Sequence, residues 1–230
     1  MEYITYGQLS DKVKAFTDTQ DEIIVSPEEL MGYCNDALVR CESIIHTLYE
    51  DYFLADTTLA LVSGQVEYSL PSDIFANKIR CIMYNNGSKV YEVYPLRSTR
   101  KKFWEIESAK LDTGGTNYNY FIKNNASTGF KLNILPTPQE TSSSNVIVYY
   151  IRKMKKVTQD SDIVDVPEYY DYIAAYMKYK IFLKEGHPNA QDAADELLML
   201  EKNMQETLAN RVPDDNNEVI LDFSHYEDMQ

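Results

Sequence analysis

The stretch "SPEELMGYCNDALVRCESIIHTL", residues 26–48, predicts a long amphipathic helix that begins at a defined point. Ser26 suits the N-cap, Pro27 the first helical position, and Glu29 the reciprocal position of a capping box. Apolar residues then recur every three or four positions and predict one buried stripe that continues to about Tyr52: Leu30, Cys34, Ala37, Cys41, Ile44 and Leu48.

From Thr57 the hydrophobic period changes from helical to two, which indicates strands. Leu59 and Leu61 precede Ser63-Gly64, and Val66, Tyr68 and Leu70 follow it, so residues 57–70 are expected to form a β-hairpin that ends at Pro71. Asn86-Gly87 lies between two further apolar runs and predicts a second hairpin with a tight turn. Three later segments bring the total to six or seven strands: "YNYFIK", "FKLNIL" and "NVIVYYIR".

Helical periodicity returns after Asp165. Pro167 is expected to open one helix and Gly186 to close it, and Pro188 to start another that ends before Pro213. Near the N-terminus, Thr5 to Gln8 are expected to cap a short helix. The apolar positions expected on these three helices are Leu9, Val13 and Phe16, then Tyr169, Ile173, Tyr176 and Leu183, then Ala190, Ala193, Leu197, Leu200 and Met204.

The order of elements predicts an α+β fold in which N- and C-terminal helices form one bundle and an antiparallel β module is inserted between them. The expected domains are residues 1–56 with 157–212 for the bundle, 57–156 for the β module, and 213–230 for an extended C-terminal tail.

Charge is concentrated in the last third of the chain. Residues 1–156 contain 19 acidic and 17 basic side chains, whereas residues 157–230 contain 17 and 5, within a net charge of −14. An acidic surface repels nucleic acid, although simple solvation explains it equally well. No run of residues approaches the length of a membrane span.

The sequence shows no clustered catalytic or metal-binding residues, so we predict neither an enzyme nor a cofactor. His46, His187 and His225 are far apart, and Cys34 and Cys41 fall on the apolar stripe of the first long helix. An Asp-Thr-Gly triplet at residues 112–114 lies in a glycine-rich loop without the second copy that aspartic proteases need.

Two basic clusters are candidates for contact with DNA or with a neighbouring protein, or are the solvated face of a short helix. The first contains Arg97, Arg100, Lys101 and Lys102 beside Trp104. The second contains Arg152, Lys153, Lys155 and Lys156.

The C-terminal segment is expected either to be disordered or to dock on a partner, and docking is the prediction we adopt. Val219, Leu221 and Phe223 alternate on one side of an extended stretch that is too short to form a core alone. One such segment binds weakly, but many copies on a ring bind strongly through effective concentration. The predicted partner-binding residues are Val219, Ile220, Leu221, Phe223 and Tyr226.

Taken in order, these segments resemble the ring-forming head-to-tail adaptor (connector, tail tubular protein A-like) family of tailed bacteriophages. The resemblance rests on the residue 26–45 helix, "LVSGQVEYSLPSDI", "KIRCIMYNNGSKVYEVYPL", "FKLNILPTPQ" followed by "VIVYYIRK", and "DVPEYYDYIAAYMKYKIFL", and it covers about residues 5–208. The segments "LRSTRKKFWEI" and "DTGGTNYN" have no clear counterpart in that family.

The resemblance implies a structural virion protein made in the host cytoplasm and located in the phage neck. It implies a homo-oligomeric ring, commonly of about twelve copies, under the portal protein. Such a ring extends the channel for double-stranded DNA and joins the capsid to a downstream tail or nozzle protein. Two alternatives are another tail-side ring or accessory protein and, from a different class, a carbohydrate-binding or hydrolytic module that uses the β region.

Overall fold

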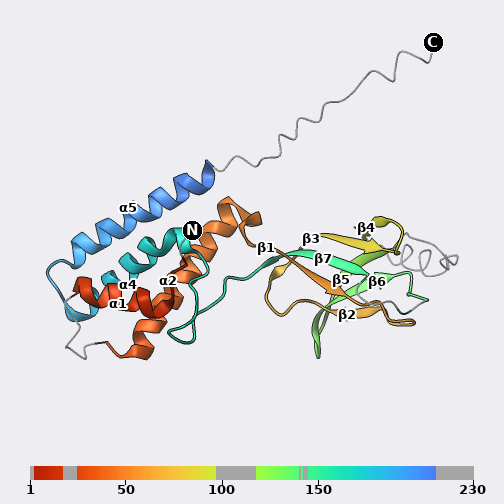
Figure 1. Cartoon of the computed structure of the whole chain (residues 1–230), viewed down its shortest axis with the longest axis horizontal. Coiled ribbons are helices and arrows are strands. Elements are labelled where there is room, and N and C mark those ends of the chain that lie inside the picture. The colour runs from red at the N-terminus through yellow and green to blue at the C-terminus, as the bar shows by residue number, and fades with distance from the viewer. Residues whose placement is uncertain (1–2, 18–24, 97–117, 140, 142–144, 211–230) are drawn as a thin grey trace, which may run out of the picture.

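The structure, a computed structural model, describes residues 3–17, 25–96, 118–139, 141 and 145–210. In this part of the chain the helices gather at one end of an elongated molecule and the strands at the other (Figure 1). The helices are α1 (Tyr6–Thr17), α2 (Pro27–Leu48), α4 (Tyr170–Glu185) and α5 (Ala190–Ala209), with short 3-10 helices η1 (Glu50–Phe53) and η2 (Pro167–Tyr169).

The helix ends follow the capping residues of the sequence. Thr5 N–H donates to Gln8 Oε1 at 2.9 Å and Gln8 N–H donates to Thr5 Oγ1 at 3.3 Å, so the start of α1 is a reciprocal cap. Ser26 Oγ accepts from Glu29 N–H at 3.2 Å, as predicted for α2. The Glu29 carboxylate does not complete that box, because it accepts from the Tyr33 hydroxyl and the Lys184 ammonium instead. Gly186 ends α4 in the left-handed conformation, with φ of 66°.

Helices from both ends of the sequence share one hydrophobic core. Its fully buried members include Leu9 from α1, Leu38 from α2 and Ile173 from α4, and α5 contributes Leu197 and Met204. Three residues predicted on buried helix faces are exposed instead: Phe16 at 60%, Leu183 at 54% and Leu48 at 41%. Next to the first two, neighbouring residues are buried: Thr17 at the end of α1, and Ile181 with Phe182 at the end of α4.

The strands form one curled sheet in the order β1-β7-β3-β4-β5-β6-β2. The sheet and the helices together confirm the predicted α+β fold class. Its inner side chains make a second buried cluster around Tyr68, Ile82, Leu132 and Val148. The strands are β1 (Leu54–Leu59), β2 (Glu67–Ser69), β3 (Ile74–Asn85), β4 (Val90–Pro95), β5 (Asn119–Asn125), β6 (Gly129–Leu135) and β7 (Val146–Arg152).

The predicted hairpin over residues 57–70 is wrong. β1 pairs with β7, from Leu54↔Ile151 to Leu59↔Val146, and β2 pairs with β6. The Ser63-Gly64 turn bonds to the loop after β6, where Gly64 N–H donates to Pro138 O at 2.9 Å. These distant pairings place Leu61 and Tyr68 inside the sheet, at 2% and 5% exposure, whereas an isolated two-stranded hairpin is marginal in water.

One pair departs from the predicted antiparallel pattern, because β4 and β5 run parallel over Tyr94↔Asn119 and Pro95↔Tyr120. The second predicted hairpin forms, since β3 pairs antiparallel with β4, but the predicted tight turn at Asn86-Gly87 is wrong. The last pair is Asn85↔Val90, so residues 86–89 form a longer connection, and Asn86 does not adopt the positive φ of a type I′ turn. Gly87, with φ of 89°, supplies the left-handed residue in the connection.

Candidate functional site

Two of the three residue sets predicted from the sequence lie outside the described residues, and only the second basic cluster lies within them. The two sets outside are the basic and aromatic set Arg97, Arg100, Lys101, Lys102 and Trp104, and the tail set Val219, Ile220, Leu221, Phe223 and Tyr226. Asn210, which follows α5, is the last described residue, and the predicted tail starts at residue 213. The surface around the end of α5 is therefore the described feature nearest in sequence to the predicted docking segment.

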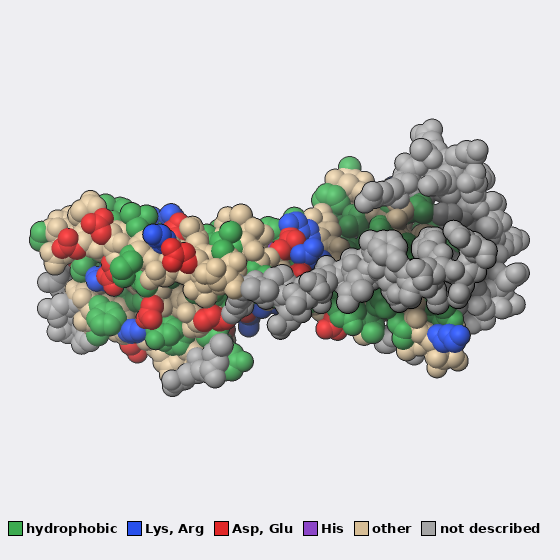
Figure 2. Space-filling view, turned by 90° about the horizontal axis from the view of Figure 1, so that it is seen from above, with side chains coloured by type: hydrophobic (Ala, Val, Ile, Leu, Met, Phe, Trp, Pro, Cys, Tyr) green, Lys and Arg blue, Asp and Glu red, His purple; other side chains and the backbone are tan. Residues whose placement is uncertain are grey.

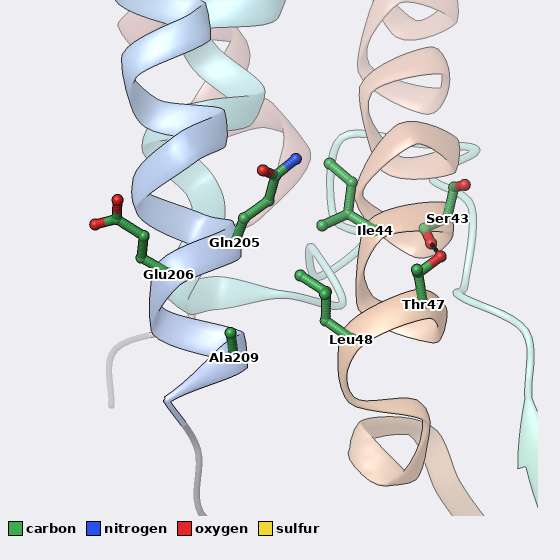
Figure 3. Close-up of a pocket in the computed structure, with 7 residues that line it drawn as sticks. All are labelled: Ser43, Ile44, Thr47, Leu48, Gln205, Glu206 and Ala209. Atoms are coloured by element: carbon green, nitrogen blue, oxygen red, sulfur yellow. Dashed lines mark hydrogen bonds between the residues drawn. The ribbon is translucent and has the colours of Figure 1, made fainter.

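An open apolar groove lies between the C-terminal halves of α2 and α5. Ile44 and Leu48 project from α2 toward α5, and Ala209 forms the opposite wall at the last turn of α5 (Figure 3). The groove has a volume of about 530 Å³. Leu48 remains 41% exposed although it continues the apolar stripe of α2. The remaining lining residues are the polar Ser43, Thr47, Gln205 and Glu206.

The solvent side of α5 adds two large exposed apolar side chains. Leu198 is 61% exposed and Met199 is 58% exposed, although both follow the buried Leu197. Single exposed apolar residues are ordinary, but these two are adjacent and lie on the same helix that forms one wall of the groove, which is typical of an interaction surface. The sequence contained a signal for this surface, because "LLML" at 197–200 has more apolar residues than one buried helix face accommodates.

Charges of both signs are mixed over the visible face of the helical part (Figure 2). Several acidic groups of the C-terminal third bind bases across the bundle, including Asp171 with Lys12 at 3.0 Å and Glu201 with Arg40 at 3.1 Å. Glu196 binds Lys178 at 2.8 Å. Within the described residues, the acidic excess is thus partly neutralised by contacts between helices.

The second basic cluster is divided by the structure. Arg152 forms a bidentate pair with Asp165, with nitrogen–oxygen distances of 2.5 and 3.0 Å. Lys153, Lys155 and Lys156 are exposed on the segment that leads from β7 back to the bundle. Three of the four bases are therefore accessible, either to DNA or to a neighbouring protein.

The potentially reactive side chains are held in structural roles. Burial raises the pKa of the Cys34 thiol to about 12, and burial also raises the pKa of Cys41, so neither forms the nucleophilic thiolate at neutral pH. His187 Nδ1 accepts from Asn189 N–H at 3.1 Å near the start of α5. In the described ranges no three His, Cys, Asp or Glu side chains are placed to hold a metal ion.

None of the helices described is long and apolar enough to cross a bilayer.

The helical bundle, the curled sheet and the open apolar groove define a class of protein: an α+β protein whose described surface offers sites for association rather than a cluster of reactive groups. The family model of the SU10 adaptor protein matches residues 4–219, so the chain belongs to this family of phage head-to-tail adaptors. Comparison with curated proteins finds no match.

Proposed function

We propose that copies of this chain form a ring beneath the portal of a tailed phage, extend its DNA channel, and join the capsid to the tail. The family match over residues 4–219 is the observation that carries this proposal. The groove between α2 and α5 supports it, because an open apolar surface is what a neighbouring copy in a ring would cover. We propose about twelve copies, the number that the resemblance to head-to-tail adaptors implies, with a head-to-tail contact whose rotation closes the ring.

Imaging of the chain mixed with purified portal protein tests the ring. A closed ring bound to the portal is the expected result. A chain that stays unbound at high concentration of both proteins would contradict the proposal. A chain that is monomeric without portal protein would not contradict the proposal, because ring formation can depend on the platform that the portal provides.

A charge placed in the groove tests which surface the ring buries. Leu48→Glu should prevent ring formation while leaving the helical circular dichroism unchanged, because Leu48 is half-exposed in the single chain. Val39→Glu is a matched control, since Val39 also lies on α2, is 48% exposed, and does not line the groove. Equal effects of the two variants would show that the groove is not the contact.

We propose that the tail residues Val219, Ile220, Leu221, Phe223 and Tyr226 dock on the portal. The position of Ala209 in the wall of the groove supports this, because Ala209 ends α5 and the tail residues follow it in the sequence. Truncation after Pro213 should weaken portal attachment and preserve the fold. Unchanged attachment would exclude the tail as the docking segment.

We further propose that Arg97, Arg100, Lys101, Lys102 and Trp104 contact the passing DNA or the next protein of the neck. Arg100→Glu with Lys101→Glu and Lys102→Glu should impair genome retention or tail attachment. The same reversal at Lys89, Lys123 and Lys202, three exposed lysines outside both basic clusters, is the matched control for net charge. If particles carrying the first variant keep their genomes and tails, the first cluster is only a solvated surface.

A further inference from the structure

The junction between the helical bundle and the sheet is built differently from either part. The buried apolar residues form two separate clusters, one in the bundle and one in the sheet. Between them lie η1, the first half of β3 and the end of β7. Phe53 and Ile151 extend the bundle core here and Phe75 packs against it, and ion pairs of η1 with β3 lie beside these side chains. Parts of a chain that have separate cores and a small contact are expected to move relative to one another.

Ion pairs connect η1 to β3 at this junction. Glu50 binds both Lys78 and Arg80, the latter at 2.7 Å, and Asp51 binds Arg80 at 2.6 Å. The Glu50 side chain is 21% exposed, so solvent screens it less than a surface carboxylate. Its hydrogen bond with Lys78 is the main reason that the pKa of Glu50 is lowered. We call Glu50, Asp51, Lys78 and Arg80 the latch.

The backbone next to the latch is strained. Ala76 and Asn77 both adopt positive φ, 47° and 58°, near the start of β3. The six residues of β3 from Ile74 to Ile79 lie opposite only three of β7, from Arg152 to Tyr150, so three extra residues bulge out of the ladder. A left-handed alanine is unfavourable and persists only where the surrounding contacts hold it.

His46 adds an aromatic contact across the same junction. Its ring stacks on Phe75, the residue before Ala76, with centroids 3.8 Å apart. Phe53 of η1 packs against it at 5.4 Å. The His46 side chain is 5% exposed, and neither ring nitrogen has a hydrogen-bond partner within the described residues; Nε2 lies 3.8 Å from Glu42 Oε1. The imidazole thus packs as a neutral aromatic ring.

We propose that this junction is a hinge with two orientations of bundle and sheet, in which the latch and the His46–Phe75 stack hold the strained Ala76–Asn77 bulge in the closed orientation. In the open orientation the latch separates and Ala76 relaxes to an ordinary β conformation. The hinge goes beyond the adaptor function, since it is a property of the single chain whether or not a ring forms.

Spin-label distances between the two parts test the hinge. Labels at Ser127→Cys in the turn after β5 and Gln191→Cys at the start of α5 are both at exposed positions, and Cys81→Ser removes the one partly exposed native thiol. The unmodified junction should give one narrow distance distribution. Glu50→Gln should add a second population. Glu67→Gln is the matched control, because Glu67 pairs with Lys123 at 3.4 Å within the sheet.

A glycine at position 76 tests the role of the strain. Because glycine adopts positive φ freely, Ala76→Gly should favour the closed orientation, and in the Glu50→Gln background it should lower the open-to-closed ratio roughly fivefold or more. Ala126→Gly, at an exposed turn residue without positive φ, should leave that ratio unchanged. A single narrow distribution for Glu50→Gln, with circular dichroism showing it folded, would overturn the hinge. Failure of Ala76→Gly to restore closure would overturn the role of strain.

Discussion

Arg152 and Asp165 are joined by two hydrogen bonds of 2.5 and 3.0 Å at the point where the chain leaves the sheet and returns to the bundle. The Arg152 guanidinium also lies 4.9 Å from the centre of the Phe53 ring, and Asp165 accepts a third bond from Lys155 N–H at 2.8 Å. The pair therefore joins the end of β7 to the return segment, and its guanidinium packs against η1.

Asp165→Asn is expected to lower the free energy of unfolding by about 1–3 kcal/mol, because the charged bonds become weaker and Arg152 loses its partner. Urea unfolding measures this change. The exposed Lys202–Glu206 pair, at 3.7 Å, provides the control, since Glu206→Gln should cost less than about 1 kcal/mol. Equal costs would show that the Arg152 pair has no special role.

Substitution by alanine is expected to have opposite effects on stability at two glycines. Gly186→Ala should destabilise the protein by about 1–2 kcal/mol, because φ of 66° places the new Cβ against the following carbonyl. Gly32→Ala, in the interior of α2 with nothing within 4 Å of the added Cβ, should stabilise it by about 0.5–1 kcal/mol. Thermal denaturation distinguishes them, and a neutral Gly186→Ala would contradict the left-handed cap.

The three cysteines should react with iodoacetamide at different rates. Cys34 and Cys41 are buried, and burial raises the pKa of each thiol, so native protein should protect both. Cys81 is partly exposed and should react faster, although burial also raises its pKa. Mass spectrometry after timed quenching measures the order. Rapid labelling of Cys34 in native protein, at the rate seen in urea, would show that the bundle core is open.

Acid is expected to destabilise the junction through His46. Burial lowers the pKa of His46 below its usual 6.5; Glu42 and Glu50 oppose this effect, and Lys78 reinforces it. The unfolded chain therefore takes up this proton at a higher pH than the folded chain. Stability should fall as pH drops below 6.5 toward the folded-state pKa.

His46→Phe keeps an aromatic ring on Phe75 and cannot ionise, so it should flatten the pH dependence of unfolding in that range. His187→Phe is the control and should keep the acid sensitivity, because His46 is still present. Identical pH profiles for the unmodified protein and His46→Phe would contradict the assignment.

The candidate site was only partly accessible to sequence reasoning. Its predicted residues, at 97–104 and 219–226, lie outside the described part of the chain and stay predictions. The groove was not predicted, because its walls come from α2 and α5, more than 150 residues apart in sequence. Ile44 and Leu48 were recognised as apolar, but periodicity does not show whether such a residue meets another helix or an open groove.

The sequence by itself determined where helices begin and end and which segments form strands. Those features depend on short-range interactions, such as the Ser26 cap, the left-handed Gly186 and the alternation of apolar residues, which act over a few residues. Only the tertiary structure decided that β1 pairs with β7 instead of β2, that β4 and β5 run parallel, and that Phe16 and Leu183 face solvent. Strand partners and helix orientation are chosen by which distant surfaces bury the most apolar area together, and a local pattern is compatible with several such choices.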